Sequence, residues 1–365
     1  MSDSLRLYST LLRAVGKAHP HEDPRRLKVF AWLVTGLLLE KSVSLPWLAT
    51  VLVSAAKAAS RVRRRRRFLA NPRVPVRADS DGLIRAALAG WAGRTISLAI
   101  DTTSWAGRLV VCRVAVIYRG RAVPLVWQVD ERTSVMLAFA DDQALLEHAR
   151  PLVPPGATII LLGDRGFRTT KLMDWCDQDP NWHFRLRLKG DQLVRLPDYQ
   201  HAQAVSTVRL KRGMVRFLHG VWLGGESYGP IEMAMAWADT PEAEPWYIAS
   251  DETAARQTLT EYGLRMDVET VHFYLKTRVG LEDCRVQSSE AVDKYMVVVH
   301  LAWAYVEQRF AQQRSAQVRT YGDILRRHRD EQAIAWLMGA SQMAIETGDP
   351  QAVLRRFLRL EALPA

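Results

Sequence analysis

The sequence predicts an α/β protein with a basic, helical N-terminal region in front of a central sheet. Apolar residues recur at helical spacing before residue 72, whereas from residue 95 onward short apolar or alternating runs predict strands. Residues 1–80 contain sixteen Lys or Arg and five Asp or Glu, while the rest of the chain holds 34 of each. A basic segment on a balanced body indicates a module that binds a polyanion.

Composition excludes several other classes of protein. The three cysteines, Cys112, Cys176 and Cys284, are far apart and form no Cys-x-x-Cys pair, so neither a disulfide framework nor a zinc site is expected. The longest apolar run, Val29–Leu39, is too short to span a bilayer and predicts a buried helix. We therefore expect a cytoplasmic protein with no membrane partner.

Several short helices are predicted before residue 72. Asp23 can cap a helix that begins at Pro24, and a later helix beginning near Ser44 is expected to continue into a run of arginines. This run contains Arg63, Arg64, Arg65, Arg66 and Arg67. A solvated or disordered basic segment is the common explanation for such a run, and contact with DNA phosphates or a minor groove is the alternative that we favour.

Five strands and two helices are predicted between residues 95 and 188. The strands are Thr95–Asp101, Leu109–Tyr118, Arg121–Val129, Ala157–Leu162 and Trp182–Leu188, and the helices are Asp141–Arg150 and Thr169–Cys176. A tight turn at Arg119-Gly120 makes the first three strands an antiparallel meander. Three strands, helix, strand, helix, strand is the element order of an RNase H-like (retroviral-integrase-like) core.

The predicted order brings two aspartates together. Asp101 ends the first strand and Asp164 follows the fourth, so a fourth strand beside the first would place both carboxylates at one end of the sheet. An aspartate at a strand end is often only a turn or helix cap. Either aspartate taken alone therefore favours that structural explanation.

The remaining chain predicts a β-rich insertion and further helices. The insertion, at about residues 190–245, contains the strand-like runs Val205–Leu210, Val215–Leu223 and Ile231–Trp237, with Trp246–Ser250 directly after it. A long buried helix is predicted over Glu290–Phe310. We expect a helical DNA-binding region at 1–80, a catalytic core at 81–310 and a helical region at 311–365.

A polar pattern stands out between Tyr262 and Lys276. Tyr262, Arg265, Glu269 and Lys276 stand at offsets 0, 3, 7 and 14. On one continuous helix they would fall within roughly 60° of arc and form a single polar stripe. A solvated helix face with ion pairs is the common explanation for such a stripe.

The spacing Tyr-x2-Arg-x3-Glu-x6-Lys resembles the signature of the insertion-sequence-4 group of DDE transposases. Asp101-Thr-Thr and Asp164-Arg-Gly also resemble the motifs around the two aspartates of that group. The resemblance covers about residues 95–278 and implies that Asp101, Asp164 and Glu269 form a catalytic triad. Each motif alone has a structural explanation, as a turn, a helix cap or a solvated helix face. Because all three occur in the expected order, we favour the catalytic triad.

The resemblance also implies ligands and partners. The triad would hold two Mg²⁺ ions about 4 Å apart, with Asp101 bridging them and Mn²⁺ able to substitute. Tyr262, Arg265 and Lys276 would contact DNA phosphates, and Trp246 would stack on a flipped base or belong to the core. His272, one turn after Glu269, has no second histidine at ligand spacing, so we expect a structural or phosphate-facing role.

The predicted function is cut-and-paste DNA transposition. A homodimer would bind terminal inverted repeats of double-stranded DNA, cleave them through a hairpin, and transfer the 3′ ends to target DNA in the bacterial nucleoid. Two alternatives remain: an RNase H-like nuclease without strand transfer, and a domesticated, non-catalytic DNA-binding protein. The intact motifs argue against the second alternative.

Overall fold

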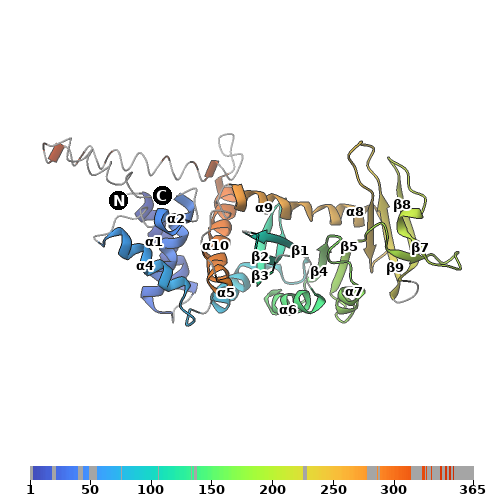
Figure 1. Ribbon diagram of the computed structural model, residues 1–365, viewed down its shortest axis with the longest axis horizontal. Coiled ribbons are helices and arrows are strands. Elements are labelled where there is room, and N and C mark those ends of the chain that lie inside the picture. The colour runs from blue at the N-terminus through green and yellow to red at the C-terminus, as the bar shows by residue number, and fades with distance from the viewer. Residues whose placement is uncertain are drawn as a thin grey trace. The chain divides into compact units, whose positions relative to one another are not determined.

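The chain divides into two compact units, which Figure 1 shows in a computed structural model. Unit 1 comprises Met1–Gly82 with Tyr274–Ala365, and unit 2 comprises Leu83–Phe273. The structure describes residues 3–18, 22–39, 44–48, 56–74, 76–105, 107–132, 134, 138–224, 228–277, 286, 288–313 and isolated positions between 323 and 348. The helices predicted beyond residue 313 and the stretch 49–55 lie largely or wholly outside these residues.

Unit 1 is helical. It contains α1 (Asp3–Ala18), α2 (Pro24–Leu39), α3 (Leu45–Leu48), α4 (Ala58–Leu69) and α10 (Ser289–Gln313), while α5 (Val76–Leu88) crosses the unit boundary. The Oδ1 atom of Asp23 accepts the backbone N–H of Arg25 at 2.8 Å, so α2 begins as predicted. Helix α10 packs against α2 and α4, which groups it with the N-terminal helices rather than with the sheet.

The apolar run Val29–Leu39 lies inside α2 and is almost entirely buried, as predicted. None of the helices within the described residues is long and apolar enough to cross a membrane.

Unit 2 is built on one mixed sheet of ten strands in the order β3-β2-β1-β4-β5-β10-β9-β8-β6-β7. The strands are β1 (Thr95–Trp105), β2 (Leu109–Ile117), β3 (Ala122–Glu131), β4 (Thr158–Gly163), β5 (Trp182–Arg187), β6 (Leu193–Arg195), β7 (Gln203–Ala204), β8 (Val215–Leu223), β9 (Tyr228–Ala236) and β10 (Trp246–Ser250). Strands β1 to β3 are antiparallel, and β4 and β5 continue parallel to β1.

The predicted meander and its turn are confirmed. Arg119 and Gly120 have φ angles of 53° and 75°, the left-handed values that a two-residue hairpin turn requires. The strands of the predicted β-rich insertion belong to the same sheet, because β10 pairs with β5 and β9, β8, β6 and β7 follow it in order. The strand predicted over Val205–Leu210 is wrong: residues 205–207 form a single 3₁₀ turn, whose backbone N–H groups at Val205 and Ser206 donate to carbonyls near residue 191.

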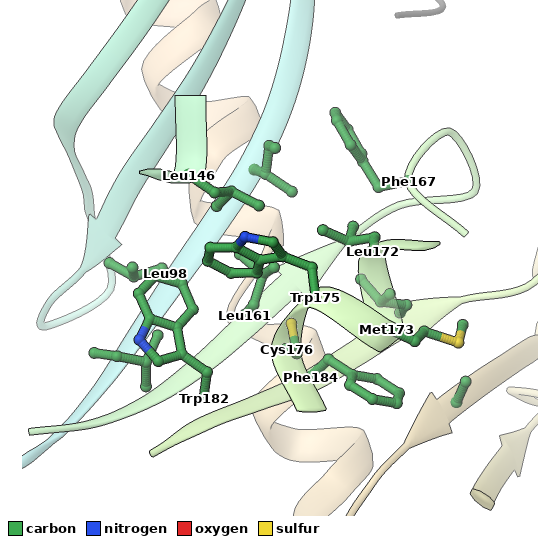
Figure 2. Close-up of a cluster of buried hydrophobic side chains, with 14 of the residues drawn as sticks. Leu98, Leu146, Leu161, Phe167, Leu172, Met173, Trp175, Cys176, Trp182 and Phe184 are labelled. Atoms are coloured by element: carbon green, nitrogen blue, oxygen red, sulfur yellow. The ribbon is translucent and has the colours of Figure 1, made fainter. Parts of the chain in front are cut away.

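Two helices cover one face of the sheet: α6 (Phe139–Ala149) and α7 (Thr170–Asp177), drawn beneath the strands in Figure 1. Their apolar side chains pack on alternate residues of the sheet, including Leu98 and Leu161, and Figure 2 shows this cluster. The rings of Trp175 and Trp182 meet edge to face with centroids 4.9 Å apart. Because neighbouring residues of a strand point to opposite faces, the residues between these positions face the other side.

The prediction of one continuous helix through Tyr262 and Lys276 is wrong. Helix α8 (Arg256–Gly263) ends before Arg265, and α9 (Met266–Thr277) begins after it. Gly263, a poor helix former, stands at the break, and the next two N–H groups bond three residues back rather than four. The four signature residues therefore do not share one helix face.

Candidate active site

Asp101 and Asp164 lie on neighbouring parallel strands, as the predicted strand order requires. Ile100 of β1 is level with Gly163, the last residue of β4, so Asp101 and Asp164 follow paired positions. Asp101 is only 8% exposed. Because side chains alternate along β1, Asp101 points to the face of the sheet opposite the core that packs against α6 and α7. The carboxylate of Asp164 also forms a local turn, because its Oδ1 accepts the N–H of Gly166 at 2.7 Å.

Arg265 stands between the three predicted acidic residues. Its Nη1 lies 3.8 Å from Oδ1 of Asp101, and its Nη2 lies 2.8 Å from Oε1 of Glu269. Burial alone would lower the pKa of Arg265, but Tyr262 and the acidic groups of Asp101, Asp164 and Glu269 raise it overall. The negative charges of all three carboxylates thus act on one guanidinium, although Asp164 and Glu269 are far apart in the sequence.

Glu269 differs from Asp101 in its surroundings. The side chain of Glu269 is 54% exposed, against 12% for Asp101. The third acidic residue of the predicted triad is therefore held by one ion pair at the surface, and rotation about its side-chain bonds meets little packing.

The structure brings two further residues to the site: Arg113, which was assigned no role from the sequence, and His272, for which a structural or phosphate-facing role was expected. His272 of α9 places Nε2 2.9 Å from Oδ2 of Asp101, and its Nδ1 lies 3.3 Å from Nη1 of Arg113. Arg113 stands directly opposite Asp101 on β2 and is 1% exposed. The only charge within Leu109–Ile117 is on Arg113, and this was the available signal.

Three other predicted DNA ligands are Trp246 on β10, Tyr262 at the end of α8, and Lys276 on α9. Tyr262 is 1% exposed, and its hydroxyl makes no hydrogen bond of normal geometry with the described residues. Burial raises the pKa of Tyr262 despite the positive charge of Arg265. Its ring meets Trp246 edge to face at 5.0 Å, so Trp246 packs in a small core with Tyr262. Lys276 is in α9, and its side chain lies outside the described part of the structure.

The arginine run is divided between two environments in unit 1. Arg65 is 1% exposed and packs its guanidinium over the ring of Trp32 at 5.2 Å, whereas its four neighbours in the run are exposed. Helical spacing puts Arg65 on the same face as the buried Leu69, four residues later. Arg63, Arg64, Arg66 and Arg67 remain available at the surface.

The donor chemistry of the site fits a hard divalent cation, because Asp101, Asp164 and Glu269 all offer carboxylate oxygens. Among the described residues, however, no three His, Cys, Asp or Glu side chains converge closely enough to form a metal-binding group. The guanidinium of Arg265 provides positive charge among these acids, and its ion pairs with Asp101 and Glu269 balance the charge of those two carboxylates. The acids fit a divalent metal in the kind of donor and in the strand placement of Asp101 and Asp164, and Glu269 is the most exposed of the three.

Comparison with known proteins shows the family of the chain. Curated protein sequences give no match to this chain. A family described as "Transposase DDE domain" matches residues 113–305, which is more than half of the chain and includes Asp164, Arg265, Glu269 and His272. Asp101 lies shortly before the matched segment. The chain belongs to the transposase DDE domain family.

Proposed function

We propose that this protein is a cut-and-paste DNA transposase of the insertion-sequence-4 group, with Asp101, Asp164 and Glu269 as its catalytic triad. The observation that carries the proposal is the pairing of Asp101 and Asp164 on adjacent parallel strands, with Arg265 linking Asp101 to Glu269. The strand order β3-β2-β1-β4-β5, antiparallel then parallel, supports an RNase H-like core.

The three acids would hold two Mg²⁺ ions, for which Mn²⁺ would substitute. When bound, such ions activate a water or 3′-hydroxyl and stabilise charge on the attacking and leaving oxygens of a phosphodiester. Asp101, held on a strand and nearly buried, keeps its position, while Glu269 turns from Arg265 toward the site. The Nη2 atom of Arg265, released from Glu269, would then donate to a DNA phosphate, while its Nη1 stays near Asp101.

Binding to DNA would involve both units. The exposed Arg63, Arg64, Arg66 and Arg67 would neutralise phosphates of the terminal repeats, and Lys276 would add a point charge near the cut. Trp246 would stack on a flipped base only if it left its contact with Tyr262. A homodimer would bring two ends together, form hairpins and transfer 3′ ends to target DNA in the nucleoid.

The proposal is tested with labelled DNA from both flanks of the gene, including its terminal repeats, incubated with Mg²⁺ and the full chain. Glu269→Gln removes the charge of the third acid, and Asp174→Asn is the matched control, because Asp174 is an exposed carboxylate on α7. We expect nicks and hairpin-sized products from the wild type and the control, and a loss of at least roughly 100-fold from Glu269→Gln.

The products also separate the alternatives. Joining of labelled 3′ ends to an added plasmid supports transposition, whereas cleavage without joining would indicate a nuclease. Equal cleavage by wild type and Glu269→Gln would remove Glu269 from the triad. Binding without any product from either protein would favour a non-catalytic DNA-binding protein.

A further inference from the structure

The carboxylate of Asp101 is held by a chain of two hydrogen bonds that begins at a buried cation. Arg113 donates from Nη1 toward Nδ1 of His272, and Nε2 of His272 meets Oδ2 of Asp101. A guanidinium has only donors, so Nδ1 must be the acceptor and the ring proton of a neutral imidazole must stand on Nε2. The geometry therefore selects one tautomer of His272, which donates to Asp101.

Arg113 is costly to bury, and this cost points to a role. It is 1% exposed, and its Nε and Nη2 atoms have no hydrogen-bond partner among the described residues. Burial lowers the pKa of Arg113 to about 10, with Asp101 acting in the opposite direction. A strand of otherwise apolar residues could hold a leucine or methionine here without that penalty.

The same chain fixes which way the carboxylate of Asp101 turns. His272 hydrogen-bonds to Oδ2 of Asp101. The other oxygen, Oδ1, therefore faces Nη1 of Arg265 at 3.8 Å, and the same guanidinium contacts Glu269. Glu269 and His272 are three residues apart on α9 and thus share a helix face. One helix face therefore carries the third acid and also contacts the first.

We propose that Arg113 and His272 are positioning residues, which orient the carboxylate of Asp101 so that Oδ1 is presented for divalent metal binding. This inference rests on the proposed function, because it takes Asp101 to be a metal ligand. Groups that hydrogen-bond to a ligating carboxylate typically change metal affinity by 10- to 100-fold when they are removed.

The matched variants are His272→Phe and His272→Gln in the full chain. Phenylalanine fills the space of the ring without donor or acceptor, whereas the carboxamide of glutamine offers an acceptor and a donor at a spacing like that of the two ring nitrogens. We expect Mn²⁺ binding, measured by electron paramagnetic resonance, to weaken about 10- to 100-fold in His272→Phe. In His272→Gln most of the affinity should return.

Asp101→Asn separates failure of the inference from failure of the proposed function. If Asp101→Asn abolishes Mn²⁺ binding while His272→Phe binds like the wild type, the positioning role is overturned and the metal site stands. If Asp101→Asn itself binds Mn²⁺ like the wild type, the proposed metal site falls and the positioning role falls with it.

A second measurement needs no metal and reads the tautomer of His272 directly in the wild type. Long-range ¹H–¹⁵N spectra of histidine-labelled wild type should show His272 with a protonated Nε2 and a bare Nδ1, its signals identified by their absence in His272→Gln. Arg113→Met should abolish this preference and let the Nδ1–H form appear. A proton on Nδ1 in the wild type would overturn the proposed chain of hydrogen bonds.

Discussion

A single carboxyl group makes the stability of unit 2 depend on pH. Asp142, in the first turn of α6, is 4% exposed, and its Oδ1 has no hydrogen-bond partner among the described residues. Burial, with a smaller effect from Asp141, raises the pKa of Asp142 to about 7 from an ordinary value of 3.8. The folded protein therefore binds a proton at this carboxyl that the unfolded chain has already released.

The sign of the effect follows from proton linkage. Between about pH 4 and pH 7 the folded state holds more protons at Asp142 than the unfolded state, so stability falls as pH rises and levels off above pH 7. Asp142→Asn should remove this slope and stabilise the protein at pH 8 by up to about 4 kcal/mol, since the pKa is raised by roughly three units and each unit corresponds to about 1.4 kcal/mol. Urea unfolding at pH 5, 6, 7 and 8, followed by tryptophan fluorescence, checks it against Asp174→Asn. Parallel pH profiles for Asp142→Asn and wild type would contradict the assignment.

Individual residues of the site were predictable only in part. The spacing of Asp101 and Asp164 in the predicted strands was enough to bring them together, because the parallel pairing of β1 with β4 follows from the element order. The contacts of Arg113 and His272 could not be predicted, since they join a strand to a helix 159 residues later. Arg265 was predicted to face DNA, but its burial between Asp101 and Glu269 depends on the break in the helix.

At the scale of elements, Arg185 of β5 joins three segments of unit 2. Its guanidinium bonds Glu261 of α8 at 2.8 Å and Glu252, just after β10, at 2.5 Å, and it also donates to the carbonyl of Phe184. The side chain of Arg185 is 4% exposed and that of Glu261 is 12% exposed, so this ion pair is buried, whereas Glu252 is 46% exposed. Arg185 thereby fixes α8, the helix that leads to Tyr262 and Arg265.

Arg185→Met should destabilise the protein by about 3 kcal/mol, because it leaves the largely buried carboxylate of Glu261 without its counter-charge. Arg187→Met is the matched control on the same strand: Arg187 pairs with the exposed Glu244, and its loss should leave the unfolding midpoint nearly unchanged. Urea denaturation of both variants checks the difference. Similar midpoints for the two would mean that the Arg185 network contributes nothing specific to the position of α8.

Elements with a strong period were predicted well, and those shaped by local breaks were not. The predicted run Val215–Leu223 is β8 as it stands, because its length and its flanking turns leave no other assignment. The turn at Leu264-Arg265 was missed, since a lone Gly263 only weakens a helix, and the contact of Tyr262 with Trp246 is long-range and leaves no local signal. The pairing of β10 with β5 was also missed, because a long insertion separates the two strands in sequence.

For the whole molecule, charge and packing divide the chain differently from sequence order. The excess of positive charge lies in residues 1–80, within unit 1, while α10, which follows unit 2 in the sequence, packs on α2 and α4. The hydrogen bond from Lys294 Nζ to the carbonyl of Asn71, at 2.7 Å, ties α10 to the chain just after the arginine run. Long-range packing of this kind has no signature in local periodicity, so the domain boundary expected at residue 310 was drawn without it.

The exposed arginines of α4 should control how DNA affinity depends on salt. Each arginine that no longer neutralises a phosphate should reduce the slope of log K against log salt by roughly 0.9, so replacing Arg63, Arg64, Arg66 and Arg67 by Gln should lower it by up to about 3.6. Gln substitution of four exposed cations in unit 2, Arg94, Arg119, Lys171 and Lys211, removes the same charge and is the control. Fluorescence anisotropy with a terminal-repeat duplex at several salt concentrations measures both slopes.

Arg65→Gln, which removes the guanidinium of Arg65 from the ring of Trp32, should leave the slope unchanged and lower the thermal midpoint instead. Equal slopes for the two quadruple variants would show that only total charge matters and would remove α4 from the DNA interface.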